Sequence, residues 1–166
     1  MFHDLTISAV RPEGDRAVAV SFAVPEALRD SFAFTPGQYL TLRADVQGTD
    51  LRRSYSIAST PDAALTVGIK HVEGGAFSTF AQGLKQGNVL RVMPPEGRFV
   101  LRDETRLVLI AAGSGITPMV SIASAALARG GEVALIYGNR TTDSIMFRDA
   151  LDALKDRYTD RFTLIH

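Results

Sequence analysis

The sequence predicts an all-β antiparallel barrel over residues 1–102, followed by the first part of a parallel α/β unit over residues 103–166. Two observations support this fold class. In the first part, short runs of alternating apolar and polar residues are separated by Gly, Pro and Asp, as in antiparallel barrels. In the second part, continuous apolar runs alternate with helical patterns, as in parallel sheets covered by helices. We therefore expect two domains joined by the charged connector at 102–106.

The barrel is expected to have six strands and one helix. Each strand is marked by period-two alternation or by an apolar run that follows a turn signal. The helix is expected at 78–84, because apolar residues recur there at helical spacing behind Gly74 and Gly75. The expected strands lie at 5–10, 17–22, 39–43, 54–58, 65–72 and 89–93.

The second part is expected to follow the order β-α-β-α-β, which implies a parallel sheet with right-handed crossovers. Pro118 fits the first turn of the first helix, and Gly130-Gly131 fits its end. The expected strands are 107–112, 133–137 and 162–165, and the expected helices are 119–129 and 145–158.

Composition excludes several functional classes. Cysteine is absent, which excludes disulfides, thiolate chemistry and a cysteine-ligated iron–sulfur cluster within this chain. The histidines, at positions 3, 71 and 166, have no metal-binding spacing, so no metal site is expected. The formal net charge of +0, without a block of like charge, argues against nucleic acid or a membrane surface as partner. No apolar run reaches the roughly 18 residues of a membrane span and no secretory signal is visible, so the expected location is the cytoplasm.

The segment Arg53-Ser54-Tyr55-Ser56 combines a cation with an aromatic ring. On a strand, Arg53 and Tyr55 project to the same face. A guanidinium binds a phosphate through two parallel hydrogen bonds, so this face suits a ligand that has both a phosphate and a flat ring. The alternative is an edge strand with a solvated arginine and a half-buried tyrosine, and the tetrapeptide taken alone favours that alternative.

Two glycine-containing segments precede helices. In Gly75-Ala76-Phe77-Ser78, the glycine permits close approach of the backbone, and the helix start offers free N–H groups to a pyrophosphate. In Gly113-Ser114-Gly115-Ile116-Thr117-Pro118, a buried strand runs into a helix, which is the context that a dinucleotide loop requires. Pro118 stands in place of the third glycine of that pattern. A plain capped turn is the commoner use of the first segment, and an ordinary strand-to-helix turn is an equal alternative for the second.

Arg140 follows the second strand of the α/β unit. In doubly wound sheets the ribose is read at this place, where an acidic residue favours a 2′-hydroxyl and an arginine accommodates a 2′-phosphate. Arg140 thus indicates a phosphorylated nucleotide, with a solvated loop arginine as an almost equal alternative. His71 and Glu73 lie beside a turn with nothing to orient them, so we interpret them as surface residues rather than as an acid–base pair.

These segments occur in an order that resembles the ferredoxin–NADP reductase superfamily over essentially the whole chain. Pro36-Gly37-Gln38-Tyr39, ahead of Arg53, and the segment 94–99 belong to the same resemblance. Within the superfamily, the sequence is most similar to the reductase component of the phenylacetyl-CoA epoxidase system of phenylacetate degradation and to related monooxygenase reductases. The stretches that carry this closer similarity are 51–56, 67–70 and 138–142.

The resemblance implies that the barrel binds FAD. Arg53 would bind the pyrophosphate, Tyr55 would pack against the isoalloxazine or ribityl portion, and Ser56 would lie near N5, where hydride arrives. Tyr55 and Ser56 are therefore the implied catalytic residues. The other implied FAD-binding residues are Ser54, Val67, Gly68, Ile69, Lys70, Gly75, Ala76, Phe77 and Ser78. The implied residues for the nicotinamide nucleotide are Gly113, Ser114, Gly115, Ile116, Thr117, Pro118 and Arg140.

The enzyme implied by the resemblance is an NAD(P)H-dependent FAD oxidoreductase. It takes hydride from NADPH, less readily from NADH, and passes electrons through a [2Fe–2S] centre to an oxygenase or a ferredoxin-type acceptor. Such a centre needs four cysteines, so we expect it only in a C-terminal domain outside this chain. The alternatives are a stand-alone flavin or ferric reductase, a non-catalytic flavin-binding regulatory subunit and a purely structural barrel.

The sequence ends after the third expected parallel strand. In a doubly wound sheet the ligand crevice opens between the first strand and the strand on its other side, which in this family is the fourth. We therefore expect this chain to be a C-terminally truncated piece of a longer reductase, which keeps the FAD site and lacks one wall of the nicotinamide pocket.

The isolated chain should copurify with a yellow flavin and be reduced only slowly by NADPH, because the nicotinamide pocket is expected to be incomplete. The measurement is the flavin absorption spectrum of the purified chain before and after anaerobic addition of NADPH. Rapid, stoichiometric bleaching at micromolar NADPH would contradict the expected loss of the pocket wall.

Overall fold

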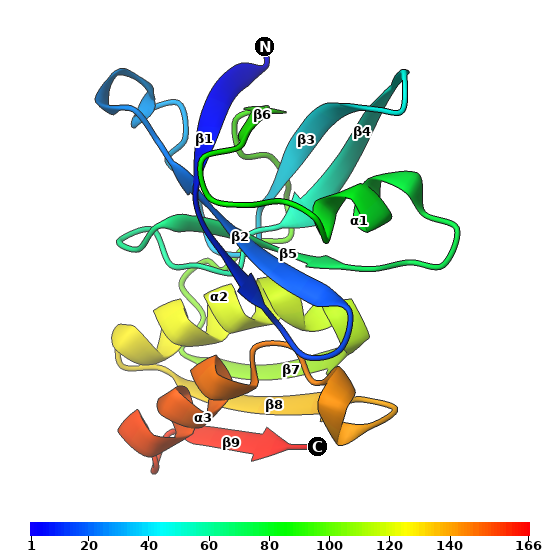
Figure 1. Cartoon of the computed structure of the whole chain (residues 1–166). Helices are drawn as coiled ribbons and strands as arrows, with labels where there is room; N and C mark the ends of the chain where they lie inside the picture. Colours follow the sequence, from blue (N-terminus) through cyan, green and yellow to red (C-terminus); the bar gives the residue numbers. More distant parts are fainter.

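The computed structural model describes residues 1–166 and contains two sheets, shown in Figure 1. A six-stranded antiparallel sheet of order β4-β3-β6-β1-β2-β5 forms the barrel. A three-stranded parallel sheet of order β7-β8-β9 lies below the barrel in that view, with helix α2 between the two sheets. This arrangement confirms the expected fold class.

The barrel buries an apolar core in which Leu5, Leu42 and Phe77 are among the largest inaccessible side chains. On β3 and β6 the residues alternate between this core and the outside, as the sequence displays, whereas β2 and β5 are buried on both faces. The elements of the barrel are β1 (His3–Pro12), β2 (Ala17–Ala23), the 3-10 helix η1 (Glu26–Leu28), β3 (Tyr39–Val46), β4 (Thr49–Ser56), β5 (Leu65–Lys70), α1 (Ala76–Ala81) and β6 (Val89–Val92).

Strand β4 begins at Thr49, well before the expected strand at 54–58. It pairs with β3 across Gln47-Gly48, whose φ angles of 54° and 80° fit a two-residue hairpin turn with positive φ at both central positions. Most side chains of β4 are exposed, so no apolar alternation marks its start in the sequence. The expected helix at 78–84 likewise lies earlier, as α1.

Helices α2 and α3 cover one face of the parallel sheet. Leu109, Leu135 and Phe162 are buried on this side, whereas Val108 and Ile110 of β7 are exposed on the other face. None of the helices combines the length and the hydropathy of a membrane-spanning helix. The elements of this unit are β7 (Arg106–Ala112), the 3-10 helix η2 (Gly113–Gly115), α2 (Ile116–Ala128), β8 (Glu132–Gly138), the 3-10 helix η3 (Thr142–Ser144), α3 (Arg148–Arg157) and β9 (Phe162–Ile165).

The expected helix at 145–158 is wrong at its start, because α3 begins only at Arg148. Before it, Ile145 is extended and Phe147 is left-handed with φ 58°. These residues rest on the hairpin between β1 and β2, where the Phe147 N–H donates to the Glu13 carboxylate at 2.8 Å. The helical spacing continues through 145–147 in the sequence, but the contact with the barrel decides the local conformation.

The barrel meets α2 through small residues. Three barrel alanines belong to the same buried apolar cluster as α2. Ser121 of α2, which is fully buried, donates a hydrogen bond to the Ser59 carbonyl at 2.7 Å. The approach is close at Gly68 of β5, where a Cβ would lie 2.8 Å from Thr117 Oγ1 and 3.0 Å from the Phe147 ring. Only a glycine leaves room for this packing.

Replacing Gly68 by alanine should lower the free energy of unfolding by about 1–3 kcal/mol, because the added methyl overpacks the interface. The measurement is urea denaturation of both proteins. Gly83→Ala is the matched control, since a Cβ there meets only the Phe80 carbonyl at 3.5 Å. The control should stay within about 0.5 kcal/mol of the wild type. Equal stability of the two variants would show that the contact at Gly68 is not tight.

Candidate functional site

Arg53 and Tyr55 lie on the same face of β4, next to α1. The Arg53 guanidinium is exposed and donates to the Arg52 carbonyl at 2.7 Å. The Tyr55 ring is half-buried and packs on Phe77 of α1, with 5.8 Å between ring centroids. Burial raises the pKa of the Tyr55 phenol, against the charge of Arg53, which lowers it. Ser54 points to the other face, where its Oγ lies 3.0 Å from Thr41 Oγ1.

The turn before α1 is held by Ser78. Its hydroxyl accepts a hydrogen bond from the Val72 N–H at 3.0 Å and donates to the Gly75 carbonyl at 3.1 Å. Ser78 is 5% exposed, so this hydroxyl shapes the turn from inside rather than facing a ligand. A Cβ at Gly75 would lie 2.6 Å from the same hydroxyl. Phe77 is buried in the barrel core, and Ala76 is the exposed residue of the segment.

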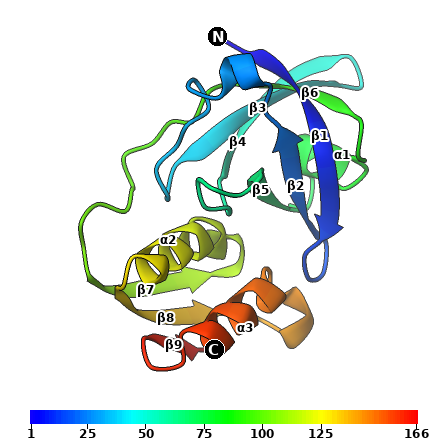
Figure 2. The same cartoon turned by 90° about the vertical axis from the view of Figure 1, so that its left-hand side faces the viewer.

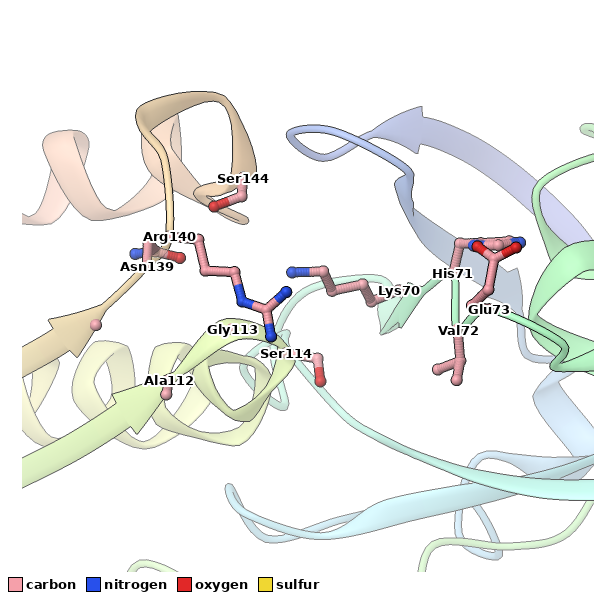
Figure 3. A pocket seen from close by; sticks show the side chains of 11 residues that line it. Lys70, His71, Val72, Glu73, Ala112, Gly113, Ser114, Asn139, Arg140 and Ser144 are labelled. Atoms are coloured by element: carbon pink, nitrogen blue, oxygen red, sulfur yellow. The ribbon is translucent and has the colours of Figure 1, made fainter.

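Strand β5 carries predicted residues with different surroundings. The side chains of Val67 and Ile69 are fully buried in the barrel core, and Gly68 is covered by the α/β unit. These three residues therefore offer a ligand only their backbone, on an outer edge of β5 that Ile57 already bridges at Val67. Lys70 differs, because its side chain leaves the end of β5 and reaches toward the α/β unit (Figure 3).

A cavity of about 710 Å³ lies between the end of β5 and the carboxyl ends of β7 and β8. Lys70 from the barrel and Arg140 from the α/β unit point toward each other across it, over Gly113 and Ser114 (Figure 3). The carboxyl ends of parallel strands are where α/β sheets bind their ligands. Two cations beside a turn of exposed backbone suit the phosphates of a nucleotide.

The Gly113–Pro118 segment divides between the cavity and the packed interior. Gly113 has φ 52°, and Ser114 and Gly115 are exposed in the η2 turn. Ile116 and Thr117 are buried, and the Thr117 hydroxyl donates to the Ser114 carbonyl at 2.9 Å. The structure therefore brings Gly113 and Ser114 to the cavity and uses Ile116 and Thr117 to anchor the loop. Pro118, in the first turn of α2, is half-buried.

Sequence reasoning missed three features of this cavity. The Lys70 side chain lines it, although the resemblance implies Lys70 only as an FAD-binding residue. Ser144 lines it from the loop after β8. Neither amide atom of Asn139, beside Arg140, has a hydrogen-bond partner. The position of Lys70 at the end of a strand was the available signal, but only the packing of the two units shows that this end meets the turn at Gly113.

Comparisons with known proteins agree with this geometry. Residues 12–101 match the oxidoreductase FAD-binding domain family. The chain belongs to this FAD-binding oxidoreductase family. Residues 109–166 match the oxidoreductase NAD-binding domain, so the expected flavin and nicotinamide cofactor classes are confirmed for the two parts of the chain.

The chain is similar to a subunit of an epoxidase, to the reductase component of a monooxygenase and to a cytochrome P450 reductase. One of the subunits of 1,2-phenylacetyl-CoA epoxidase from Escherichia coli (strain K12) is 45% identical over 99% of the chain and 48% of its own length. The ferredoxin reductase component of 3-ketosteroid-9-alpha-monooxygenase from Rhodococcus rhodochrous is 42% identical over 98% of the chain and 48% of its own length. The solved cytochrome P450 reductase GcoB from Amycolatopsis is 30% identical, with a TM-score of 0.79 over 98% of the chain and 51% of that protein. The chain thus spans about half the length of the curated relatives it matches.

The surroundings of β4 and α1 fit an FAD. Arg53 is an exposed cation of the kind that a pyrophosphate requires, and Tyr55 adds an aromatic surface on the same strand face. Gly74, with φ 72°, has no atom within 4 Å of its Cβ position, so the backbone next to this face is open to close approach.

Arg53→Ala should raise the Kd for FAD about tenfold or more, because a hydrogen bond to a charged group contributes about 1.5–3 kcal/mol. Fluorescence titration of the flavin-free chain measures this change. Arg52→Ala is the matched control, because its guanidinium lies over the Phe2 ring at 5.2 Å and is not on the Arg53 face. Equal losses in the two variants would mean that general charge, rather than the Arg53 contact, holds the flavin.

Proposed function

We propose that this chain is the flavin- and nucleotide-binding part of a reductase that takes hydride from NADPH and delivers electrons to an oxygenase. The observation that supports it most is the cavity in which Lys70 and Arg140 converge next to the FAD-binding barrel. When bound, FAD supplies the chemistry of accepting hydride and releasing single electrons. The residues of the chain bind the two nucleotides and orient their rings.

On the barrel, the proposed FAD contacts are those that the family resemblance implies, and the exposed guanidinium of Arg53 and the ring of Tyr55 support them. Arg53 binds the pyrophosphate, and the turn at Gly75 approaches it from the start of α1. Tyr55 packs against the flavin, and Ser56, which follows it on β4, lies near the hydride-accepting atom. The buried hydroxyl of Ser78 supports this arrangement by holding the turn at Gly75 in place.

In the cavity, the proposed contacts are to the phosphates of NADPH. Arg140 binds the 2′-phosphate, which makes NADPH the favoured donor over NADH. Lys70 binds the pyrophosphate together with the exposed backbone of Gly113 and Ser114. This assignment is supported by the arrangement of one cation from each unit around a turn with positive φ at Gly113.

The proposed electron route continues through a [2Fe–2S] centre to an oxygenase, or to a ferredoxin-type acceptor. The names of the relatives support an oxygenase system over a stand-alone flavin or ferric reductase. Phenylacetyl-CoA epoxidase is the proposed oxygenase, since one of its subunits is 45% identical to this chain. We also propose two domains, residues 1–102 and 103–166, and a location in the cytoplasm, where NADPH is available.

Arg140→Ala should reduce the preference for NADPH over NADH about tenfold or more, because a 2′-phosphate loses its charged partner. The measurement is the rate of loss of flavin absorbance under anaerobic NADPH and NADH. Arg148→Ala is the control, since Arg148 pairs with Asp152 at 3.9 Å on α3. An unchanged preference in Arg140→Ala would remove the assignment of this cavity to the 2′-phosphate.

A further inference from the structure

The hairpin tip, the turn 13–16 between β1 and β2, lies against the loop 140–147 between β8 and α3 (Figure 2). The Asp15 N–H donates to the Asp143 carbonyl at 2.6 Å. The next residue of the loop, Ser144, lines the cavity. One side of this loop therefore rests on the barrel while its other side forms a wall of the nucleotide cavity.

Glu13 and Gly14 make two further contacts, each two residues further along the same loop. Gly14, with φ 62°, packs so closely on the Ile145 carbonyl that a Cβ would lie 2.7 Å from its oxygen. The Glu13 carboxylate accepts the Phe147 N–H at 2.8 Å, and its side chain is only 16% exposed. Burial raises the pKa of the Glu13 carboxyl, against the Phe147 N–H and Arg11, which lower it. Little water is therefore available to replace this carboxylate.

Phe147 is held in an uncommon conformation. Its φ of 58° places a bulky residue in the left-handed region, which such side chains rarely adopt. Such a conformation persists only where the surroundings support it. Here the Glu13 carboxylate holds the N–H, and the ring is buried against Gly68 of the barrel. The start of α3 and the end of the loop are thus set by contacts with the other unit.

The hairpin tip also contacts the barrel wall of the cavity. Arg16, with φ 55°, places its guanidinium 3.3 Å from His71 Nε2 and 3.5 Å from Glu73 Oε2. His71 and Glu73 both line the cavity. One short turn is therefore bonded to both walls of the cavity, one in each unit.

We propose that the hairpin tip is a latch that holds the loop 140–147 in its nucleotide-binding position, with Glu13 as a positioning residue. This inference rests on the proposed function, because the loop begins with Arg140, the proposed contact of the 2′-phosphate. Glu13 does not line the cavity and acts through Phe147. Without the carboxylate, the N–H of Phe147 loses its acceptor, the left-handed residue relaxes, and the loop no longer presents Arg140 at a fixed distance from Lys70.

The first measurement does not depend on any nucleotide. Glu13→Ala should speed hydrogen exchange of the Phe147 amide about tenfold or more, the loss expected for one hydrogen bond to a charged acceptor. Glu13→Gln keeps an acceptor and should restore most of the protection. Glu26→Ala, an exposed glutamate in η1, is the control and should exchange like the wild type. If the Phe147 amide of Glu13→Ala exchanges at the wild-type rate, the proposed role of the hairpin tip is overturned.

The second measurement is calorimetric binding of adenosine 2′,5′-bisphosphate to the FAD-loaded chain. Glu13→Ala should weaken binding about three- to tenfold, with rescue by Glu13→Gln and unchanged affinity for FAD. If Glu13→Ala binds the bisphosphate as tightly as the wild type while Arg140→Ala binds it weakly, the positioning role of Glu13 is overturned. If the wild type and Arg140→Ala bind equally, the proposed binding of the 2′-phosphate by Arg140 fails, and hydrogen exchange still decides whether the hairpin tip holds the loop.

Discussion

The close packing of α2 against the barrel is the constraint on which the rest of the structure depends. It is possible because β5 has no side chain at Gly68, where Thr117 and the Phe147 ring occupy the space. Tight packing of this kind fixes the relative position of two sheets that share no strand. The cavity has one wall on each sheet, so this contact helps to set the distance between its walls.

The polar residues of the binding motifs are divided between exposed and buried roles. The hydroxyls of Ser78 and Thr117 are buried, and each bonds to a carbonyl of its own turn. The exposed groups next to them are backbone atoms and the cations of Arg53 and Arg140. A hydroxyl in a short motif can therefore act on a ligand indirectly, by fixing the turn whose backbone faces it. This division explains why such motifs combine glycine, which permits the turn, with serine or threonine, which stabilises it.

Most of the fold could be predicted because the residue patterns are local. Alternation identified the core strands of the barrel, and the strand 162–165 has the expected bounds. Local patterns failed where another part of the chain decides the conformation. The delayed start of α3 depends on Glu13, which is far away in sequence, and the early start of β4 depends on a turn with Gln47 at positive φ. The candidate site shows the same limit, since the direction of the Lys70 side chain follows from the packing of the two units.

The cavity also has a thermodynamic consequence. Because its walls belong to two different sheets, any ligand that bridges Lys70 and Arg140 adds to the free energy that holds the sheets together. Coupling of this kind is reciprocal, so a change that loosens the contact between the sheets weakens ligand binding by the same free energy. The affinity for such a ligand therefore depends on the whole interface between the two sheets. Substitutions far from every ligand atom, such as those at the buried alanines of the barrel, should also change it.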